Sequence, residues 1–192
     1  MKRVCIFCGS SSGSREVYTT AAATLAKDIV RRGMGIVYGG SNCGLMATIA
    51  NTALDAGGEV IGVIPQSMVV REIAHTGLTE LRIVNSMHER KALMADLSSA
   101  FVAMPGGYGT LDEFCEILTW AQLGLHNKPC GILNVAGYYN KLLAAFDHSV
   151  DEGFLRPKNR EIVISERDPE LLLTRLLHNA DNGLIKGTES RG

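Results

Sequence analysis

Short apolar segments alternate with longer amphipathic segments along this 192-residue chain. The apolar segments are rich in Val, Ile, Ala and Cys, a composition and length that predict buried strands. The predicted strands cover residues 3–8, 36–38, 59–64, 81–84, 100–103, 130–133 and 162–164.

The longer segments repeat their apolar residues at helical spacing. In the first of them Ala22, Leu25, Ala26 and Ile29 fall on one face, which predicts a helix packed on the sheet. Residues 66–77 fit either a short helix or an irregular crossover, and the polar tail from Asn179, including residues 181–192, is expected to be flexible. The predicted helices cover residues 16–32, 45–56, 87–97, 110–123, 138–152 and 169–178.

Strands that alternate with helices predict a parallel sheet with helices on both faces. We therefore expect residues 1–180 to form a single-domain, Rossmann-like, doubly wound α/β fold. Ligands of such sheets bind outside the carboxyl ends of the strands. The loops expected at that edge are residues 9–14, 39–44, 85–87 and 105–110. Three of them are rich in glycine, which favours a ligand that contains phosphate.

Composition narrows the functional classes. Hydrophobic residues make up 46% of the chain, charged residues 20%, and the formal net charge is −1, so nothing favours a nucleic acid or an anionic membrane as a partner. No apolar run is long enough to span a membrane, and the first residues predict a strand rather than a signal peptide. The expected location is the cytoplasm.

The spacing of the cysteines and histidines does not predict a metal site. The five cysteines come without a secretory signal, which argues against a disulfide framework. Cys5 and Cys8 have CxxC spacing, but within a strand they would point to opposite faces. No histidines stand at HxxxH spacing. We expect no metal and no organic cofactor.

Common nucleotide motifs are absent. The loop from Gly9 to Gly13 is not GxGxxG, and no acidic residue ends the second predicted strand, where a dinucleotide ribose would need one. The chain also lacks the GxxxxGK[ST] motif of P-loop enzymes. What remains is a set of glycine turns suited to one phosphate and one sugar.

The most informative segment runs from Ala103 to Glu116. Gly106, Gly107 and Gly109 are expected to adopt positive φ and let the backbone approach a ligand. The helix after them would present unpaired N–H groups to an anion, with Thr110 as its cap and Glu113 completing a capping box. The alternative is an ordinary strand-to-helix turn with no ligand.

Charged residues near this edge suggest glycosidic chemistry. Glu113 and Glu116 share a helix face, and a carboxylate near a sugar can stabilise the positive charge that develops on the ring. Arg90 suits bidentate contact with phosphate or hydroxyl groups. The alternative for each is a solvated helix surface.

Three motifs in order resemble one family. Pro105–Glu113 reads Pro-Gly-Gly-x-Gly-Thr-x-x-Glu, and it follows blocks at 38–46 and 87–91. This pattern resembles the LONELY GUY (LOG) family of cytokinin riboside 5′-monophosphate phosphoribohydrolases, often mislabelled as lysine decarboxylases, over about residues 4–165. The resemblance implies that Arg90 and Glu113 are catalytic. The glycine turns and the resemblance together predict substrate contacts from Ser10, Gly39, Gly40, Gly44, Glu80, Lys91, Gly106, Gly107, Tyr108, Gly109, Thr110, Asp112, Glu116 and Thr119.

The resemblance also implies a reaction. A nucleoside 5′-monophosphate, either AMP or an N6-modified relative, would be hydrolysed to free base and ribose 5-phosphate by a homodimer. Asp112 stands where many family members have Glu, which leaves its substrate contact open. Two alternatives remain: a nucleotide-binding protein similar to molybdenum-cofactor carriers, and a pyridoxal-phosphate lysine decarboxylase with Lys91 as its Schiff-base lysine. The sequence does not identify the preferred base or the group that protonates it.

Overall fold

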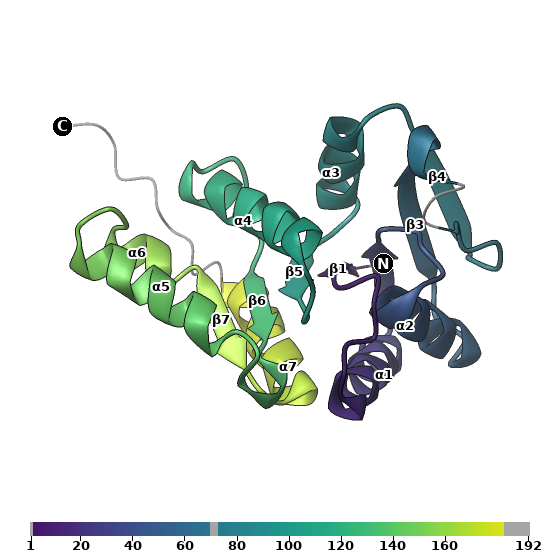
Figure 1. The fold of residues 1–192 in the computed structure, drawn as a ribbon, viewed down its shortest axis with the longest axis horizontal. Coiled ribbons are helices and arrows are strands. Elements are labelled where there is room, and N and C mark those ends of the chain that lie inside the picture. The colour runs from purple at the N-terminus through teal and green to yellow at the C-terminus, as the bar shows by residue number, and fades with distance from the viewer. Residues whose placement is uncertain (1, 70–72, 183–192) are drawn as a thin grey trace.

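The computed structural model describes residues 2–69 and 73–182. In this part of the chain seven parallel strands form one sheet in the order β4-β3-β2-β1-β5-β6-β7 (Figure 1). All seven predicted strands are present, so the predicted α/β class is confirmed. The strands are β1 (Arg3–Phe7), β2 (Gly35–Tyr38), β3 (Val60–Pro65), β4 (Glu80–Val84), β5 (Ala100–Ala103), β6 (Cys130–Leu133) and β7 (Val163–Glu166).

Helices cover both faces of the sheet. In Figure 1 α1, α2 and α7 lie on the lower side, and α3 and α4 lie on the upper side. The short helix α6 was not predicted. Residues 66–77 fitted either a short helix or an irregular crossover, and a 3₁₀ turn, η1, occupies their first three positions. The helices are α1 (Glu16–Arg31), α2 (Gly44–Asp55), η1 (Gln66–Met68), α3 (Met87–Asp96), α4 (Tyr108–Gln122), η2 (Val135–Gly137), α5 (Asn140–Asp151), α6 (Pro157–Arg160) and α7 (Pro169–Asn182).

The strands divide the core into two layers because successive side chains point to opposite faces. Ile6 and Cys8 pack under α1, α2 and α7, whereas Cys5 and Phe7 pack under α3 and α4. The predicted separation of the two cysteines is thus confirmed. All five cysteines are free thiols.

Several predicted helix ends differ from the observed ones, most clearly the start of α4 and the end of α7. Helix α4 begins at Tyr108 with Gly107 as its N-cap, so Thr110 lies inside the first turn and does not cap it. The Thr110–Glu113 capping box therefore does not form, because Thr110 is buried within the helix start. Helix α7 continues through Asn182, past the end predicted at His178; residues 183–192 lie outside the described residues.

The strand order places a topological switch between β1 and β5. From β1 the chain winds outward through β2, β3 and β4, and from β5 it winds the other way through β6 and β7. The loops after β1 and β5 meet there, since the Gly9 N–H donates to the Pro105 carbonyl at 3.0 Å. Such a switch is where open α/β sheets bind their ligands.

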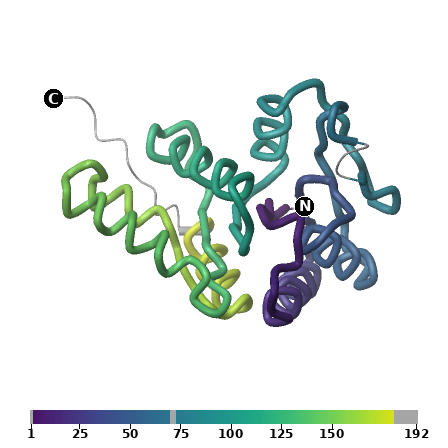
Figure 2. Tube along the Cα trace, in the orientation of Figure 1, coloured from purple at the N-terminus to yellow at the C-terminus, as the bar shows by residue number. Residues whose placement is uncertain are grey.

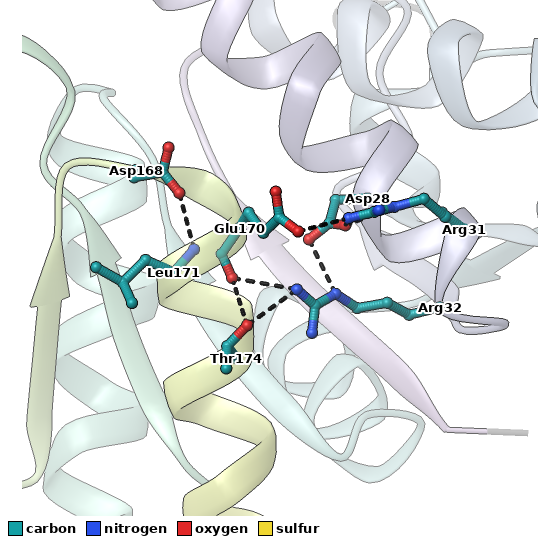
Figure 3. A network of polar contacts seen from close by, with 7 residues as sticks. All are labelled: Asp28, Arg31, Arg32, Asp168, Glu170, Leu171 and Thr174. Carbon is teal, nitrogen blue, oxygen red and sulfur yellow. Dashed lines mark hydrogen bonds and ion pairs between the residues drawn. The ribbon is translucent and has the colours of Figure 1, made fainter.

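Helices α1 and α7 lie side by side on the face of the sheet opposite to α3 and α4 (Figure 2). Polar contacts join these two helices. Buried Asp28 pairs with Arg31 and with Arg32, whose Nε lies 2.9 Å from Asp28 Oδ2. Arg31 also pairs with Glu170 at 2.9 Å, and Arg32 Nη2 donates to Thr174 Oγ1 at 3.0 Å (Figure 3). We call these five residues the α1–α7 network. Among residues 2–69 and 73–182, no helix has the length and apolar character needed to cross a membrane.

Candidate active site

A cavity of about 260 Å³ opens at the switch point. Its walls come from the ends of β1 and β2 and from helices α2, α3 and α4. Eight residues predicted as site residues line it together: Ser10, Gly39, Arg90, Gly107, Tyr108, Gly109, Thr110 and Glu113.

The first turn of α4 forms one wall of this cavity. No side chain caps the helix, so its first N–H groups have no side-chain oxygen as an acceptor. A Cβ atom on Gly107 or Gly109 would meet nothing within 4 Å, which leaves room for a ligand against the backbone. The N-terminus therefore offers hydrogen-bond donors and a positive dipole end to an anion.

The glycines of this turn serve a different purpose from the one predicted. None of Gly106, Gly107 and Gly109 has positive φ, so the expectation of left-handed backbone was wrong. Gly106 is instead required for close packing, because a Cβ atom there would lie 2.1 Å from Thr110 Oγ1 and 2.9 Å from the Gly9 nitrogen. The turn is tight because two backbone segments touch.

Two tyrosines missed in the sequence analysis support this turn from behind. The Tyr138 hydroxyl donates to the Gly106 carbonyl and the Tyr139 hydroxyl donates to the Met104 carbonyl, each at 2.7 Å. Tyr139 is buried, and its own N–H donates to Asn134 Oδ1 at 2.7 Å. A Tyr-Tyr pair after an apolar strand was the available signal, since buried tyrosine hydroxyls need an acceptor.

Arg90 reaches the cavity from α3 and is almost fully buried. Its Nε donates to the Val63 carbonyl at 3.0 Å and its Nη2 donates to the Gly39 carbonyl at 2.9 Å. A Cβ atom on residue 39 would lie 2.3 Å from Nη2, so glycine at this position makes room for the guanidinium. Two backbone carbonyls thus hold a buried cation in a fixed orientation.

Glu113, on the second turn of α4, lies beside Arg90 in the cavity lining. Its Oε1 lies 3.8 Å from Arg90 Nη1, and the two side chains are 12% and 6% exposed. A buried cation beside a carboxylate favours the ionised form of that carboxylate. The pair therefore sets a negative oxygen and a fixed positive group on one small cavity, next to a helix N-terminus.

Lys91, Asp112 and Glu116 form a second ionic cluster outside the cavity lining. Lys91 Nζ lies 2.8 Å from Glu116 Oε2 and 3.2 Å from Asp112 Oδ2. The hydrogen bond with Glu116, followed by that with Asp112, raises the pKa of Lys91. The structure brings these three predicted residues together with one another, but none of them is among the residues that line the cavity.

The other predicted residues are spread more widely. Gly40 and Gly44 have positive φ, and Gly44 packs on the Ser10 backbone, where a Cβ atom would approach to 2.4 Å. Glu80 begins β4, at the amino-terminal edge of the sheet, and pairs with Arg82 at 2.6 Å. Thr119 lines a different groove between α4, α5 and α6. The structure therefore does not bring Glu80 or Thr119 to the cavity.

Three cavity residues outside the set of predicted contacts are apolar. Ile6, Cys8 and Met46 form part of the lining and belong to the core layer under α1 and α2. Burial raises the pKa of the Cys8 thiol, so it is present as the neutral thiol and is a poor nucleophile. An adjoining hollow of about 340 Å³ shares Gly9, Ser10 and Gly107 with the cavity and has no charged residue in its lining.

Several known proteins are similar to this chain in sequence. Residues 46–176, more than half of the chain, match the protein-family model described as "Possible lysine decarboxylase". The chain is 50% identical over 175 residues to a protein of Oryza sativa subsp. japonica named probable cytokinin riboside 5′-monophosphate phosphoribohydrolase LOGL3, which covers 91% of this chain and 83% of that one. It is also 50% identical to cytokinin riboside 5′-monophosphate phosphoribohydrolase LOG5 of Arabidopsis thaliana, over 91% and 77% of the two chains.

Solved structures share the fold at lower identity. The molybdenum cofactor carrier protein of Chlamydomonas reinhardtii superposes with a TM-score of 0.69 at 23% identity, covering 92% of this chain and 98% of that one. The molybdenum cofactor binding protein of Rippkaea orientalis gives a TM-score of 0.70 at 20% identity, over 93% and 97%. At these identities the likeness shows the fold alone.

Proposed function

This chain belongs to the LOG family of phosphoribohydrolases, and from that membership and the cavity geometry we propose that it cleaves nucleoside 5′-monophosphates. The reaction is hydrolysis of the N-glycosidic bond of an adenosine 5′-monophosphate, with or without an N6 substituent. Water is the second substrate, and the products are the free base and ribose 5-phosphate. The observation that carries this proposal is the Arg90–Glu113 pair beside the N-terminus of α4, which no side chain caps.

The phosphate is assigned to the start of α4. Residues Gly107 to Thr110 line the cavity there, together with Ser10 from the loop after β1. Oriented N–H groups and the helix dipole bind an anion without a metal ion. Fixing the phosphate would orient the ribose toward the floor of the cavity, where Glu113 and Arg90 lie.

Bond cleavage is assigned to Glu113 and Arg90. As the bond from C1′ to the base nitrogen breaks, its electron pair leaves with the base and positive charge develops on the ribose ring. The Glu113 carboxylate stabilises that charge and takes a proton from the water that adds to C1′. Arg90 binds the sugar phosphate or its hydroxyls from a fixed position. The base takes up one proton as it leaves.

Lysine decarboxylase chemistry fits this site poorly. A pyridoxal-phosphate enzyme needs a lysine that reaches the neutral amine form to make a Schiff base. Lys91 is paired with two carboxylates, which raise its pKa and favour the ammonium form. The glycosidic reaction requires no neutral lysine.

We also propose that the protein works in the cytoplasm as a homodimer that binds no nucleic acid. Leu123, Leu125 and Phe154 are among the large apolar side chains that are strongly exposed in the monomer, and they offer surface for a second copy. Multi-angle light scattering of purified protein should give twice the mass of one chain. A single-chain mass at micromolar concentration would contradict the dimer.

Base release tests the reaction directly. Purified protein is incubated with AMP, with isopentenyladenosine 5′-monophosphate and with the unphosphorylated riboside, and free base is measured by chromatography. We expect base from the monophosphates and little from the riboside, because the riboside lacks the group bound at α4. The ratio of the two monophosphate rates defines the base preference.

Two variants complete the experiment. Glu113→Gln removes the charge at constant size and should abolish most of the activity, while Glu161→Gln, an exposed glutamate far along the chain, should not. Nucleotide binding without any base release by the wild-type protein would instead support a carrier. It would also refute the role given to Glu113.

A further inference from the structure

Two adjacent cations on α3 face three carboxylates on α4. Arg90 pairs with Glu113, and the next residue, Lys91, pairs with Asp112 and Glu116. Asp112 precedes Glu113 by one residue and Glu116 follows it by three, so the Lys91 contacts bracket Glu113 along the helix. The two helices are thereby held at points on both sides of the proposed catalytic carboxylate.

Lys91 is occupied by these contacts rather than directed into the cavity. Its side chain is 14% exposed, and the Glu116 side chain, whose Oε2 lies 2.8 Å from Lys91 Nζ, is 22% exposed. Lys91 is not among the residues that line the cavity, whereas its neighbour Arg90 is. A phosphate contact from Lys91 would require it to leave two carboxylates: Asp112, to which it donates a hydrogen bond at 3.2 Å, and Glu116, with which it forms an ion pair at 2.8 Å.

We propose that Lys91 is a positioning residue, which fixes the rotation of α4 so that Glu113 faces Arg90 in the cavity. This inference rests on the proposed hydrolysis, and it differs from the expected role of Lys91 as a substrate contact. Glu116 is its principal partner, because it is less exposed than Asp112 and lies closer to Nζ.

The geometry of the Arg90–Glu113 pair explains why α4 needs a positioning contact. Arg90 is fixed by two backbone carbonyls, but Glu113 depends on the placement of α4, and its Oε1 is already 3.8 Å from Arg90. A displacement of about 1 Å in a catalytic group can lower a rate by roughly 100-fold. A small rotation of α4 would therefore affect turnover more than binding, because the phosphate is assigned to backbone groups at the helix start.

Paired substitutions test this role. Lys91→Met and Glu116→Leu each break the ion pair, whereas the double variant replaces it with two apolar side chains of similar length. Replacement of a partly buried ion pair by apolar residues is often tolerated when both partners change together. Lys141→Met, which removes an exposed lysine on α5, is the matched control.

The expected result is a separation of turnover from binding. Lys91→Met should lower kcat by about 10- to 100-fold with little change in KM, the double variant should recover most of that loss, and Lys141→Met should match wild type. Melting temperatures of the two single variants and the double variant should be non-additive, which shows that the two side chains interact.

A substrate contact would give the opposite pattern. Lys91→Met would raise KM, or the dissociation constant for AMP measured by calorimetry, and the double variant would not recover. Either that result or additive melting temperatures overturns the proposal. If wild-type protein releases no base, the hydrolysis itself is refuted; AMP binding by Lys91→Met and the melting temperatures still decide whether Lys91 contacts the nucleotide or only Glu116.

Discussion

Two networks of arginines and carboxylates lie on opposite faces of the sheet and are built differently. At the cavity, Arg90 and Glu113 are 6% and 12% exposed and lie 3.8 Å apart. In the α1–α7 network, Arg31 and Glu170 are 64% and 63% exposed and lie 2.9 Å apart (Figure 3). The buried pair has the longer contact, although burial strengthens the attraction between charges.

The differences in burial and in distance suggest that the Arg90–Glu113 pair serves function and that the α1–α7 network serves stability. Exposed ion pairs contribute little to stability, and the buried Asp28 at the centre of the α1–α7 network supplies its main anchoring group. At the cavity, two charges are removed from water without a close mutual contact, which costs desolvation energy. Such an arrangement is expected where the groups are meant to act on a ligand. Substitutions at the two networks should therefore affect different properties.

The largest expected effect is on turnover, at Glu113. Glu113→Gln should lower kcat for base release by about 100- to 1,000-fold, since the positive charge on the ribose loses its carboxylate. The melting temperature should change much less than turnover, because Arg90 keeps its hydrogen bonds to the Val63 and Gly39 carbonyls. Steady-state kinetics and calorimetry measure both values. A clear fall in melting temperature with unchanged turnover would reverse the roles of the two networks.

A smaller effect is expected from Gly39→Ala. The added Cβ atom would lie 2.3 Å from Arg90 Nη2 and must displace the guanidinium from the Gly39 carbonyl. Because the misplaced group lies beside Glu113, kcat/KM should fall by roughly 10- to 100-fold. Kinetics of the purified variant check this value. Unchanged kinetics would mean that the orientation of Arg90 has no part in the reaction.

At the α1–α7 network the effect should fall on stability alone. Asp28→Asn removes the charge that pairs with Arg31 and Arg32, and should lower the free energy of unfolding by about 2 kcal/mol, since hydrogen bonds to charged groups are lost. Base release should match wild type. Denaturant titration measures the change, with Asp151→Asn at an exposed position as control. A loss of turnover in the folded variant would contradict the separation of the networks.

The smallest effect concerns pH and lies near the far end of α4. His126 Nε2 donates to the Ile117 carbonyl at 3.0 Å, and its Nδ1 accepts from the Lys128 N–H at 3.1 Å. Burial, assisted by the charge of Lys128, lowers the pKa of His126 despite the bond to Ile117. The unfolded chain then binds a proton more readily than the folded one as pH falls below the ordinary value of 6.5.

Stability should consequently decline as pH falls from 7 toward the lowered pKa of folded His126, and level off below it. His126→Gln should flatten this part of the profile of unfolding free energy against pH, whereas His148→Gln, at an exposed position on α5, should leave it unchanged. Equal slopes in wild type and His126→Gln would show that another group governs the acid limb.

The parallel sheet could be predicted because apolar runs and helical periodicity are local properties of the sequence, and the folded chain keeps them. Seven apolar runs became seven strands, and the face predicted for the first helix, with Ala22, Leu25, Ala26 and Ile29, is fully buried. Helix ends were less predictable. Thr110 has the chemistry of a cap, but contacts between the turn and Gly9 place the helix start two residues earlier.

Two predicted substrate contacts, Glu80 and Thr119, do not reach the cavity. Glu80 precedes the Met87–Lys91 block by only a few residues, yet a parallel strand carries it to the opposite edge of the sheet. Thr119 follows Glu113 by fewer than two turns, but it faces α5 and α6 instead of the cavity. The directions of strands and helix faces decided both positions.

The sequence by itself determined the alternation of strands and helices, the glycine turns at one edge of the sheet, and the residue types able to act on a sugar phosphate. These follow from periodicity and backbone stereochemistry, which are local properties. Only the tertiary structure decided that Val63 and Gly39 hold Arg90, that Tyr138 and Tyr139 support the central turn, and that Lys91 pairs with Glu116. These contacts join residues far apart in the chain, and they depend on how the helices and strands pack.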